Sequence, residues 1–194
     1  MNDIPDIKKY EEVIEGLLRR IQRYNRTADL DLVRKAFHYS FAAHIEQFRK
    51  SGEPYYEHPL QVVKILVGLR MDYQTIIGGL LHDVVEDTVV TTEEVEKEFG
   101  KKIALLVDGV TKISGLKLLE FEHQQAENFR KMLLSMVKDI RVIMIKFADR
   151  LHNMRTLGSL PDEKRRRIAL ETREVYAPLA HRLGLSKIKT ELED

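Results

Sequence analysis

Four side chains able to bind a metal ion or move a proton lie within one six-residue segment of this 194-residue chain, His-Asp-Val-Val-Glu-Asp. On a helix, His82 would lie one turn before Glu86, and Asp83 one turn before Asp87, so the pairs would form two neighbouring rows. The segment follows an apolar run at residues 76–81 that contains two adjacent glycines. Glycine inside a helix costs about 1 kcal/mol relative to alanine, and we expect close helix packing to offset it. The alternative interpretation is a helix C-terminus with exposed acids.

Further candidate ligands lie far from this segment in the sequence. His58 precedes Pro59, which suits the first turn of a helix, so the histidine would lie at a helix entrance. Asp149, Asn153 and Thr156 are spaced to form one polar stripe on an otherwise apolar helix. A carboxylate buried there needs a partner. That partner is either a metal ion or a distant lysine or arginine.

Two imidazoles and two carboxylates could therefore ligate one cation, and they belong to His58, His82, Asp83 and Asp149. This set suits a borderline divalent cation such as Mn²⁺, Fe²⁺ or Zn²⁺, whereas Ca²⁺ prefers oxygen ligands only. An ion with five or six coordination positions keeps room for water and lowers its pKa, which gives a nucleophile near neutral pH. Glu86 and Asp87, one turn further on, could orient that water and accept its proton.

The composition excludes several classes of protein. A hydrophobic fraction of 43% is too high for a disordered chain, and 32 basic residues against 31 acidic ones give a net charge of +1. That balance gives no global attraction to nucleic acid or to a membrane surface, so any basic site must be local. There is no cysteine, no signal-peptide pattern and no apolar run near the roughly 20 residues that span a bilayer. We expect a soluble, cytoplasmic protein.

The spacing of apolar residues predicts an all-α protein. Besides the helix that carries the His-Asp segment, helices are expected over about residues 6–24, 29–47, 59–69, 101–110, 140–155 and 162–182, and from residues 125 and 186 onward. Asp72 and Asp139 are suitable N-caps. Thr91 and Glu94 form a capping box before a short helix that should end at Gly100.

Two segments are ambiguous. Residues 141–147 have strand propensity, but residues 148–155 continue without a breaker, and one long buried helix is our interpretation. Residues 111–124 have the weakest pattern in the chain, so we expect a mobile segment beside the active site, with a partly helical segment as the alternative. Pro178 should kink the helix at 162–182, and Gly184 should end it.

Longer motifs resemble the hydrolase domain of RelA/SpoT-type alarmone enzymes in the HD phosphohydrolase superfamily. That superfamily's signature is an adjacent His-Asp pair with a distant histidine and aspartate. The motifs span about residues 28–194, at 49–55, 58–59, 81–88, 107–112, 126–132, 146–157 and 176–184. The long first helix and the match to the last residues make the chain resemble the long bifunctional members more than the small stand-alone hydrolases.

The resemblance implies an all-helical HD fold that holds one Mn²⁺ and releases pyrophosphate from the 3′ position of guanosine 3′,5′-bis(diphosphate) (ppGpp) and its pentaphosphate relative (pppGpp). By motif position it implies the metal ligands His58, His82, Asp83 and Asp149. It implies the catalytic acids Glu86 and Asp87. It implies nucleotide-pocket residues at Arg49, Lys50, Ser51, Asn153 and Thr156. Taken alone, Arg49 and Lys50 would be read as solvated surface.

The expected organisation has three parts. Residues 1–27 form an N-terminal helix packed on the domain, residues 28–185 form the HD-type metal-dependent hydrolase domain, and residues 186–194 begin a helix that leads to an absent downstream domain. Long family members carry a synthetase domain and regulatory domains there, so synthesis is not predicted for this chain. The alternatives are another HD-type nucleotide phosphohydrolase and a non-catalytic alarmone-binding regulatory module.

Overall fold

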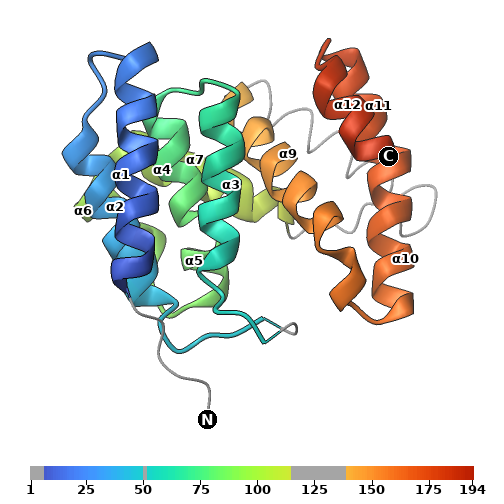
Figure 1. The fold of residues 1–194 in the computed structure, drawn as a ribbon, viewed down its shortest axis with the longest axis horizontal. Helices are drawn as coiled ribbons and strands as arrows, with labels where there is room; N and C mark the ends of the chain where they lie inside the picture. Colours follow the sequence, from blue (N-terminus) through green and yellow to red (C-terminus); the bar gives the residue numbers. More distant parts are fainter. Residues whose placement is uncertain (1–6, 50–51, 115–138) are drawn as a thin grey trace.

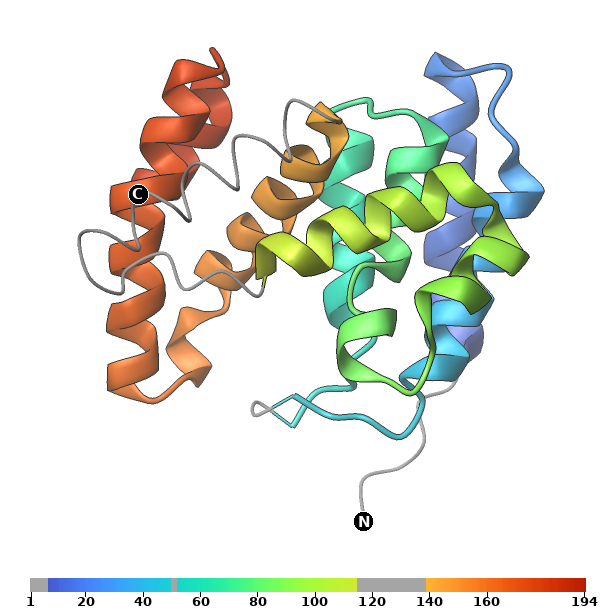
Figure 2. The ribbon, with the colours of Figure 1, turned by 180° about the vertical axis from the view of Figure 1, so that it is seen from behind.

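The computed structural model describes residues 7–49, 52–114 and 139–194, and within these ranges the regular structure is helical (Figures 1 and 2). The predicted all-α class is confirmed. The only β-type pairing in the described part of the chain is an isolated antiparallel bridge between Phe48 and Pro54. None of the described helices is long and apolar enough to cross a membrane.

The first half of the chain forms a group of helices that pack side by side (Figure 1). They are α1 (Ile7–Tyr24), α2 (Leu30–Ala43), α3 (Glu57–Gly68), α4 (Tyr73–Leu81), α5 (Val84–Asp87), α6 (Thr92–Phe99) and α7 (Lys101–Ser114). The predicted caps are confirmed: Asp72 accepts hydrogen bonds from the first turn of α4, and Thr91 and Glu94 form the capping box of α6. Gly100 ends α6 with a φ of +86°.

The second half begins with α9 (Ile140–Arg155), which lies between the first group and the C-terminal helices (Figure 1). Asp139 caps it as predicted, by accepting a hydrogen bond from the amide of Arg141. Residues 142–152 are buried on every side of this helix, which explains the strand-like composition of 141–147. One long buried helix, rather than a strand, is therefore confirmed.

The C-terminal helices form a separate stack against α9 (Figure 1). They are η1 (Leu157–Ser159), α10 (Asp162–Glu171), η2 (Thr172–Tyr176), α11 (Ala177–Arg182) and α12 (Ser186–Glu193). The predicted disturbance by Pro178 takes the form of a π-helical turn, in which the Ala177 amide donates to the Thr172 carbonyl five residues back. Proline lacks an amide hydrogen and its ring clashes with the carbonyl four residues earlier, so a wider turn relieves the contact.

Adjacent glycines let α4 lie between α3 on one side and α7 with α9 on the other. A Cβ at Gly78 would come within 2.8 Å of Cδ1 of Ile145, and one at Gly79 within 2.5 Å of Cδ1 of Leu66. Both partner side chains are fully buried. The close helix packing predicted for this pair is confirmed. It brings the end of α4, where the His-Asp segment begins, against α3 and α9.

Two helix ends differ by four residues from the sequence-based prediction. The second helix ends at Ala43, four residues before the predicted end, because Gln47 turns back to contact the backbone and side chain of His44. The helix α7 continues through Ser114, so residues 111–114 are its last turn, while the remainder of the segment predicted to be mobile lies outside the described residues. The helix expected from residue 125 also starts outside them.

Candidate metal centre

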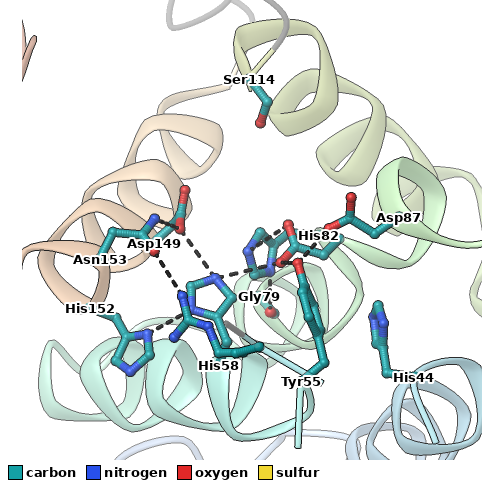
Figure 3. A network of polar contacts seen from close by, with 12 residues as sticks. His44, Tyr55, His58, Gly79, His82, Asp87, Ser114, Asp149, His152 and Asn153 are labelled. Atoms are coloured by element: carbon teal, nitrogen blue, oxygen red, sulfur yellow. Dashed lines mark hydrogen bonds and ion pairs between the residues drawn. The ribbon is translucent and has the colours of Figure 1, made fainter. Parts of the chain in front are cut away.

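The candidate ligands come from three elements, and the side chains of His58, His82 and Asp149 point toward one another in Figure 3. His58 lies in the first turn of α3, and Asp149 lies past the middle of α9. His82 and Asp83 form the turn between α4 and α5, so the His-Asp segment is a turn followed by the short helix α5 rather than part of the one continuous helix predicted. The turn keeps helical backbone angles, and the Asp87 amide still donates to the Asp83 carbonyl.

Three of these side chains form a buried group able to hold a metal ion. One ligand atom from each of His58, His82 and Asp149 lies within 4.8 Å of the other two, and all three residues are buried. Asp83 does not meet this distance criterion with all three residues. Its Oδ1 nevertheless lies 3.0 Å from Nε2 of His82, and its Oδ2 lies 3.5 Å from Nε2 of His58. It therefore borders the group and is placed to complete a four-ligand set.

The hydrogen bonding of His82 leaves a nitrogen lone pair facing the cluster. Nδ1 lies 2.8 Å from the Gly79 carbonyl, which can only accept, so Nδ1 carries the proton. In the neutral imidazole the lone pair is then on Nε2, and within the described part of the chain this atom is buried with no hydrogen-bond partner. A lone pair 3.0 Å from a carboxylate oxygen of Asp83 is repelled unless a proton or a metal cation is shared by the two atoms. The residues therefore fit a metal ion.

His58 has a partner that fixes its ring. Its Nδ1 lies 2.6 Å from Nδ1 of His152, and the two ring centroids are 4.8 Å apart (Figure 3). The pKa of His152 is lowered to about 3, first by burial and then by the nearby imidazole of His58 and guanidinium of Arg49. A neutral His152 can accept a hydrogen bond from the Nδ1–H of His58, which directs Nε2 of His58 toward Asp149, 3.2 Å away.

Asp149 is held by two neighbours on its own helix. Nζ of Lys146 lies 2.5 Å from Oδ2, and Asn153 donates to Oδ1 over 2.6 Å. Burial opposes the charge of this carboxyl, but Lys146, His58 and His82 together outweigh it, so the pKa of Asp149 lies well below its usual range. A lysine partner, left open in the sequence as the alternative to a metal ion, is thus present, and the Oδ1 atom still faces His58.

The two predicted catalytic acids have different surroundings. Asp87 lies at the end of α5, where its carboxylate accepts a hydrogen bond from the hydroxyl of Tyr55 (Figure 3). Glu86 is exposed on α5, and partial desolvation of its carboxyl followed by the charge of Asp83 raises its pKa above the usual value. Ser114, at the end of α7, offers a hydrogen bond that partly offsets this rise. A carboxyl with a raised pKa is better matched to proton transfer near neutral pH.

The predicted nucleotide-pocket residues are only partly described. Lys50 and Ser51 lie outside the described residues. Arg49 reaches across to α9, where its NH2 group donates to Oδ1 of Asn153 over 3.3 Å. Thr156 caps the end of α9, with its hydroxyl donating to the His152 carbonyl over 3.0 Å. Arg49 and Asn153 are therefore brought to the cluster, and Thr156 lies one turn beyond it.

Sequence reasoning missed three residues at this site: Tyr55, Lys146 and His152. Helical spacing from Asp149 could have identified Lys146 and His152, which lie three residues before and after it. Tyr55 had no comparable signal, because its contact with Asp83 and Asp87 depends on how the loop before α3 folds back onto α5.

Comparison with known proteins connects this geometry to a family. The family profile described as "HD domain" matches residues 36–186. A GTP pyrophosphokinase of Myxococcus xanthus is 52% identical over 97% of this chain, and the bifunctional (p)ppGpp synthase/hydrolase SpoT of Escherichia coli K12 is 53% identical over 94% of it. The chain spans about a quarter of the length of these relatives, 25% and 26% respectively.

A solved structure extends the likeness to three dimensions. It is described as a metazoan ortholog of SpoT that hydrolyses ppGpp and plays a role in starvation responses. It matches with a TM-score of 0.66 and 30% sequence identity, over 84% of this chain and 92% of that one.

Proposed function

Because this chain belongs to the HD-domain family and, within it, to the RelA/SpoT proteins, we propose that it is a Mn²⁺-dependent guanosine-3′,5′-bis(diphosphate) 3′-pyrophosphohydrolase. It would convert ppGpp to GDP, and pppGpp to GTP, with release of pyrophosphate. The observation that carries the proposal is the buried group of His58, His82 and Asp149 beside Glu86 and Asp87. A buried metal-binding group with nearby unligated carboxylates suits hydrolysis of a phosphate ester.

The proposed ligands are His58, His82, Asp83 and Asp149. Their mix of imidazole nitrogen and carboxylate oxygen suits Mn²⁺, Fe²⁺ or Zn²⁺, and the family resemblance selects Mn²⁺. When bound, the cation supplies Lewis-acid stabilisation of phosphate charge and lowers the pKa of water. The protein must hold these ligand atoms in place with their lone pairs available. The hydrogen bond from His82 to the Gly79 carbonyl does so for His82, because it uses Nδ1 and not Nε2.

The reaction requires one proton acceptor and one proton donor. Water attacks the phosphorus next to the ribose 3′ oxygen, the bond between that phosphorus and the 3′ oxygen breaks, and the 3′ oxygen leaves with a proton. Glu86, with its raised pKa, suits proton transfer near neutral pH. Asp87, held by Tyr55, is placed to orient the attacking water or to take its proton. We assign acid–base catalysis to this pair without dividing the two roles.

The nucleotide would bind between the loop before α3 and the end of α9. Arg49, Lys50, Ser51, Asn153 and Thr156 are the proposed contacts. A substrate with four or five phosphates needs positive charge, and a net charge of +1 means that the charge must be local. Arg49 is already close to the cluster through Asn153, and its guanidinium can pair with phosphate or stack on a purine.

The direct test is to incubate the purified chain with ppGpp, with and without Mn²⁺, and to separate the products. We expect GDP and pyrophosphate in equal amounts with Mn²⁺ and neither product in excess chelator. A panel of deoxynucleoside triphosphates and cyclic nucleotides, assayed in parallel, addresses the other HD-type hydrolases. Turnover of that panel in preference to ppGpp would contradict the substrate assignment. Tight ppGpp binding without turnover would instead identify a non-catalytic regulatory module.

The surrounding protein is also part of the proposal. The relatives are about four times longer than this chain, and one is named as both synthase and hydrolase. We expect a synthetase domain and regulatory domains to follow α12 in a cytoplasmic protein. Residues 1–27 would belong to the hydrolase unit, residues 28–185 would be the HD domain, and residues 186–194 would lead onward. This domain itself has no proposed contact with nucleic acid or membrane.

A further inference from the structure

The hydroxyl of Tyr55 joins the two aspartates of the His-Asp segment (Figure 3). It lies 2.9 Å from Oδ2 of Asp83 and also hydrogen-bonds Oδ2 of Asp87. Tyr55 belongs to the loop before α3, whereas both aspartates border α5, so this contact connects separate elements. A tyrosine hydroxyl is protonated near neutral pH, so it can donate a hydrogen bond to a carboxylate.

The ring of Tyr55 is itself held in place. It stacks on the imidazole of His44, with ring centroids 4.8 Å apart and planes inclined by 25°. His44 is only 1% exposed, and its Nδ1 lies 2.8 Å from Oε1 of Gln47. The amide nitrogen of Gln47 donates to the backbone carbonyl of Asp87 over 2.8 Å. Asp87 is thus fixed at its carboxylate by Tyr55 and at its backbone by Gln47.

The same contacts reach the loop that carries Arg49. The Tyr55 amide donates to the Gln47 carbonyl over 2.9 Å, and the Arg49 amide donates to the Glu53 carbonyl over 2.8 Å. Together with the bridge between Phe48 and Pro54, these bonds join residues 47–49 to residues 53–55. Arg49 lies on one side of this pairing and Tyr55 on the other.

We propose that Tyr55 is a positioning residue that holds the Asp87 carboxylate in its working orientation and ties it to the Arg49 loop. This inference rests on the proposed function for its catalytic consequence, but the hydrogen bond can be tested without any substrate. If Tyr55 only packed in the core, the effect of removing its hydroxyl would not depend on the charge of Asp87. The side chain is half-buried and its hydroxyl contacts two carboxylates, which is unlike a core tyrosine.

Tyr55→Phe removes the hydroxyl and keeps the ring that stacks on His44. We expect kcat for ppGpp to fall by about tenfold or more, with KM within about threefold of wild type, because the Asp87 carboxylate loses its fixed orientation. Tyr24→Phe is the matched control: its hydroxyl is also half-buried and donates one hydrogen bond of 2.9 Å, to the Met71 carbonyl, away from the site. This control should keep wild-type kcat.

A double-mutant cycle tests whether Tyr55 acts through Asp87. In an Asp87→Asn background, Tyr55→Phe should lower kcat by less than about twofold, because its target is already removed. Equal losses in both backgrounds would show that Tyr55 does not act through Asp87 and would overturn the inference. So would unchanged kcat in Tyr55→Phe alone.

Thermal unfolding of the same four proteins separates this inference from the proposed function. If Tyr55 holds Asp87, the changes in Tm should be non-additive by about 1–3 °C, whatever the substrate is. Additive Tm changes would overturn the inference even when the wild type hydrolyses ppGpp. Non-additive Tm changes in a wild-type protein that does not hydrolyse ppGpp would support the contact between Tyr55 and Asp87 and would refute only the proposed substrate.

Discussion

At the scale of single residues, the site depends on which atom of each side chain faces the cluster. His82 and His58 both turn Nε2 inward, and each uses Nδ1 for a contact in the opposite direction. For His82 the contact is a backbone carbonyl, which can only accept a hydrogen bond. For His58 the contact is another imidazole, which can accept a hydrogen bond only if it is neutral. The low pKa of His152 meets that condition at pH 7.

Replacing His152 should therefore weaken metal binding while the three buried ligands stay in place. We expect His152→Phe to lower Mn²⁺ affinity by about 10–100-fold, the usual effect of losing a hydrogen bond to a ligand histidine. His152→Gln keeps an acceptor and should lose less. The free Mn²⁺ signal in an electron paramagnetic resonance titration measures the affinity. His38→Phe, a histidine of α2 that packs on Phe37, is the control, and equal affinity in all variants would refute this role of His152.

Charge removal at Glu86 and Asp87 should separate chemistry from metal binding. Glu86→Gln and Asp87→Asn keep the shape of each side chain, so both variants should still bind one Mn²⁺ and ppGpp. In at least one of them kcat should fall by about 100-fold or more, the typical loss on removing a general base. Metal and substrate titrations beside a turnover assay give the comparison. Loss of Mn²⁺ in Glu86→Gln would make Glu86 a ligand, and near-normal turnover in both would place the base elsewhere.

The residue types at this site were readable from the sequence, but their mutual orientation was not. Spacing placed Asp149 and Asn153 on one face of a helix, and the structure joins them by a hydrogen bond. The pairing of His58 with His152 links residues 94 positions apart, and no local pattern encodes such a contact. The same holds for Tyr55 and Asp87, which are 32 positions apart.

At the scale of elements, α4 determines where the His-Asp segment lies. Its two glycines allow α3 and α9 to approach, and His82 lies three residues after Gly79. The sequence predicted this packing, because glycines inside an apolar helix are otherwise unfavourable. It did not predict the break between α4 and α5, since nothing in the residues 81–88 is a helix breaker.

Gly79→Ala should therefore destabilise the protein. The added Cβ would come within 2.5 Å of Cδ1 of Leu66 and 3.6 Å of Cγ2 of Val63, both in the buried face of α3. Overpacking of this kind costs about 1–3 kcal/mol, which exceeds the gain of up to about 1 kcal/mol from better helix propensity. Urea unfolding measures the difference.

Gly16→Ala is the matched control for this prediction. Gly16 also lies inside a helix, α1, but the nearest atom to an added Cβ is the end of the Arg19 side chain at 4.0 Å. This variant should be as stable as wild type or more stable by up to about 1 kcal/mol. Equal stabilisation in both variants would mean that Leu66 moves aside and that the packing around α4 is looser than the distances indicate.

At the scale of the whole molecule, the cluster lies where both halves of the chain meet. His58 and His82 come from the first group of helices, and Asp149 comes from α9. The residue after Asp149 extends the connection: Arg150 lies 3.1 Å from Glu171 of α10 and 4.3 Å from the ring of Tyr176. A metal ion bound by His58, His82 and Asp149 would therefore stabilise the packing of the first group of helices, α9 and the C-terminal helices together.

Metal binding should consequently raise the Tm of the whole chain in one transition. A ligand at 100 times its Kd stabilises the native state by about 2.7 kcal/mol, which corresponds to about 5–11 °C for a chain of this size. We expect Tm to rise with Mn²⁺ concentration in the wild type, and the rise to shrink toward acid pH because the ligands must be deprotonated to bind. Scanning calorimetry across a Mn²⁺ series measures both effects.

The variants His82→Gln and His181→Gln decide whether the cluster is responsible. His82 lies in the buried group, whereas His181 is exposed on α11. The glutamine at position 82 should abolish most of the Mn²⁺-dependent rise, and the one at position 181 should leave it unchanged. A rise of wild-type size in His82→Gln would place the cation elsewhere, because a binding site that has lost one of its few nitrogen ligands cannot keep the same affinity. A rise lost in both variants would mean that Mn²⁺ stabilises the chain through dispersed surface contacts rather than through the buried group.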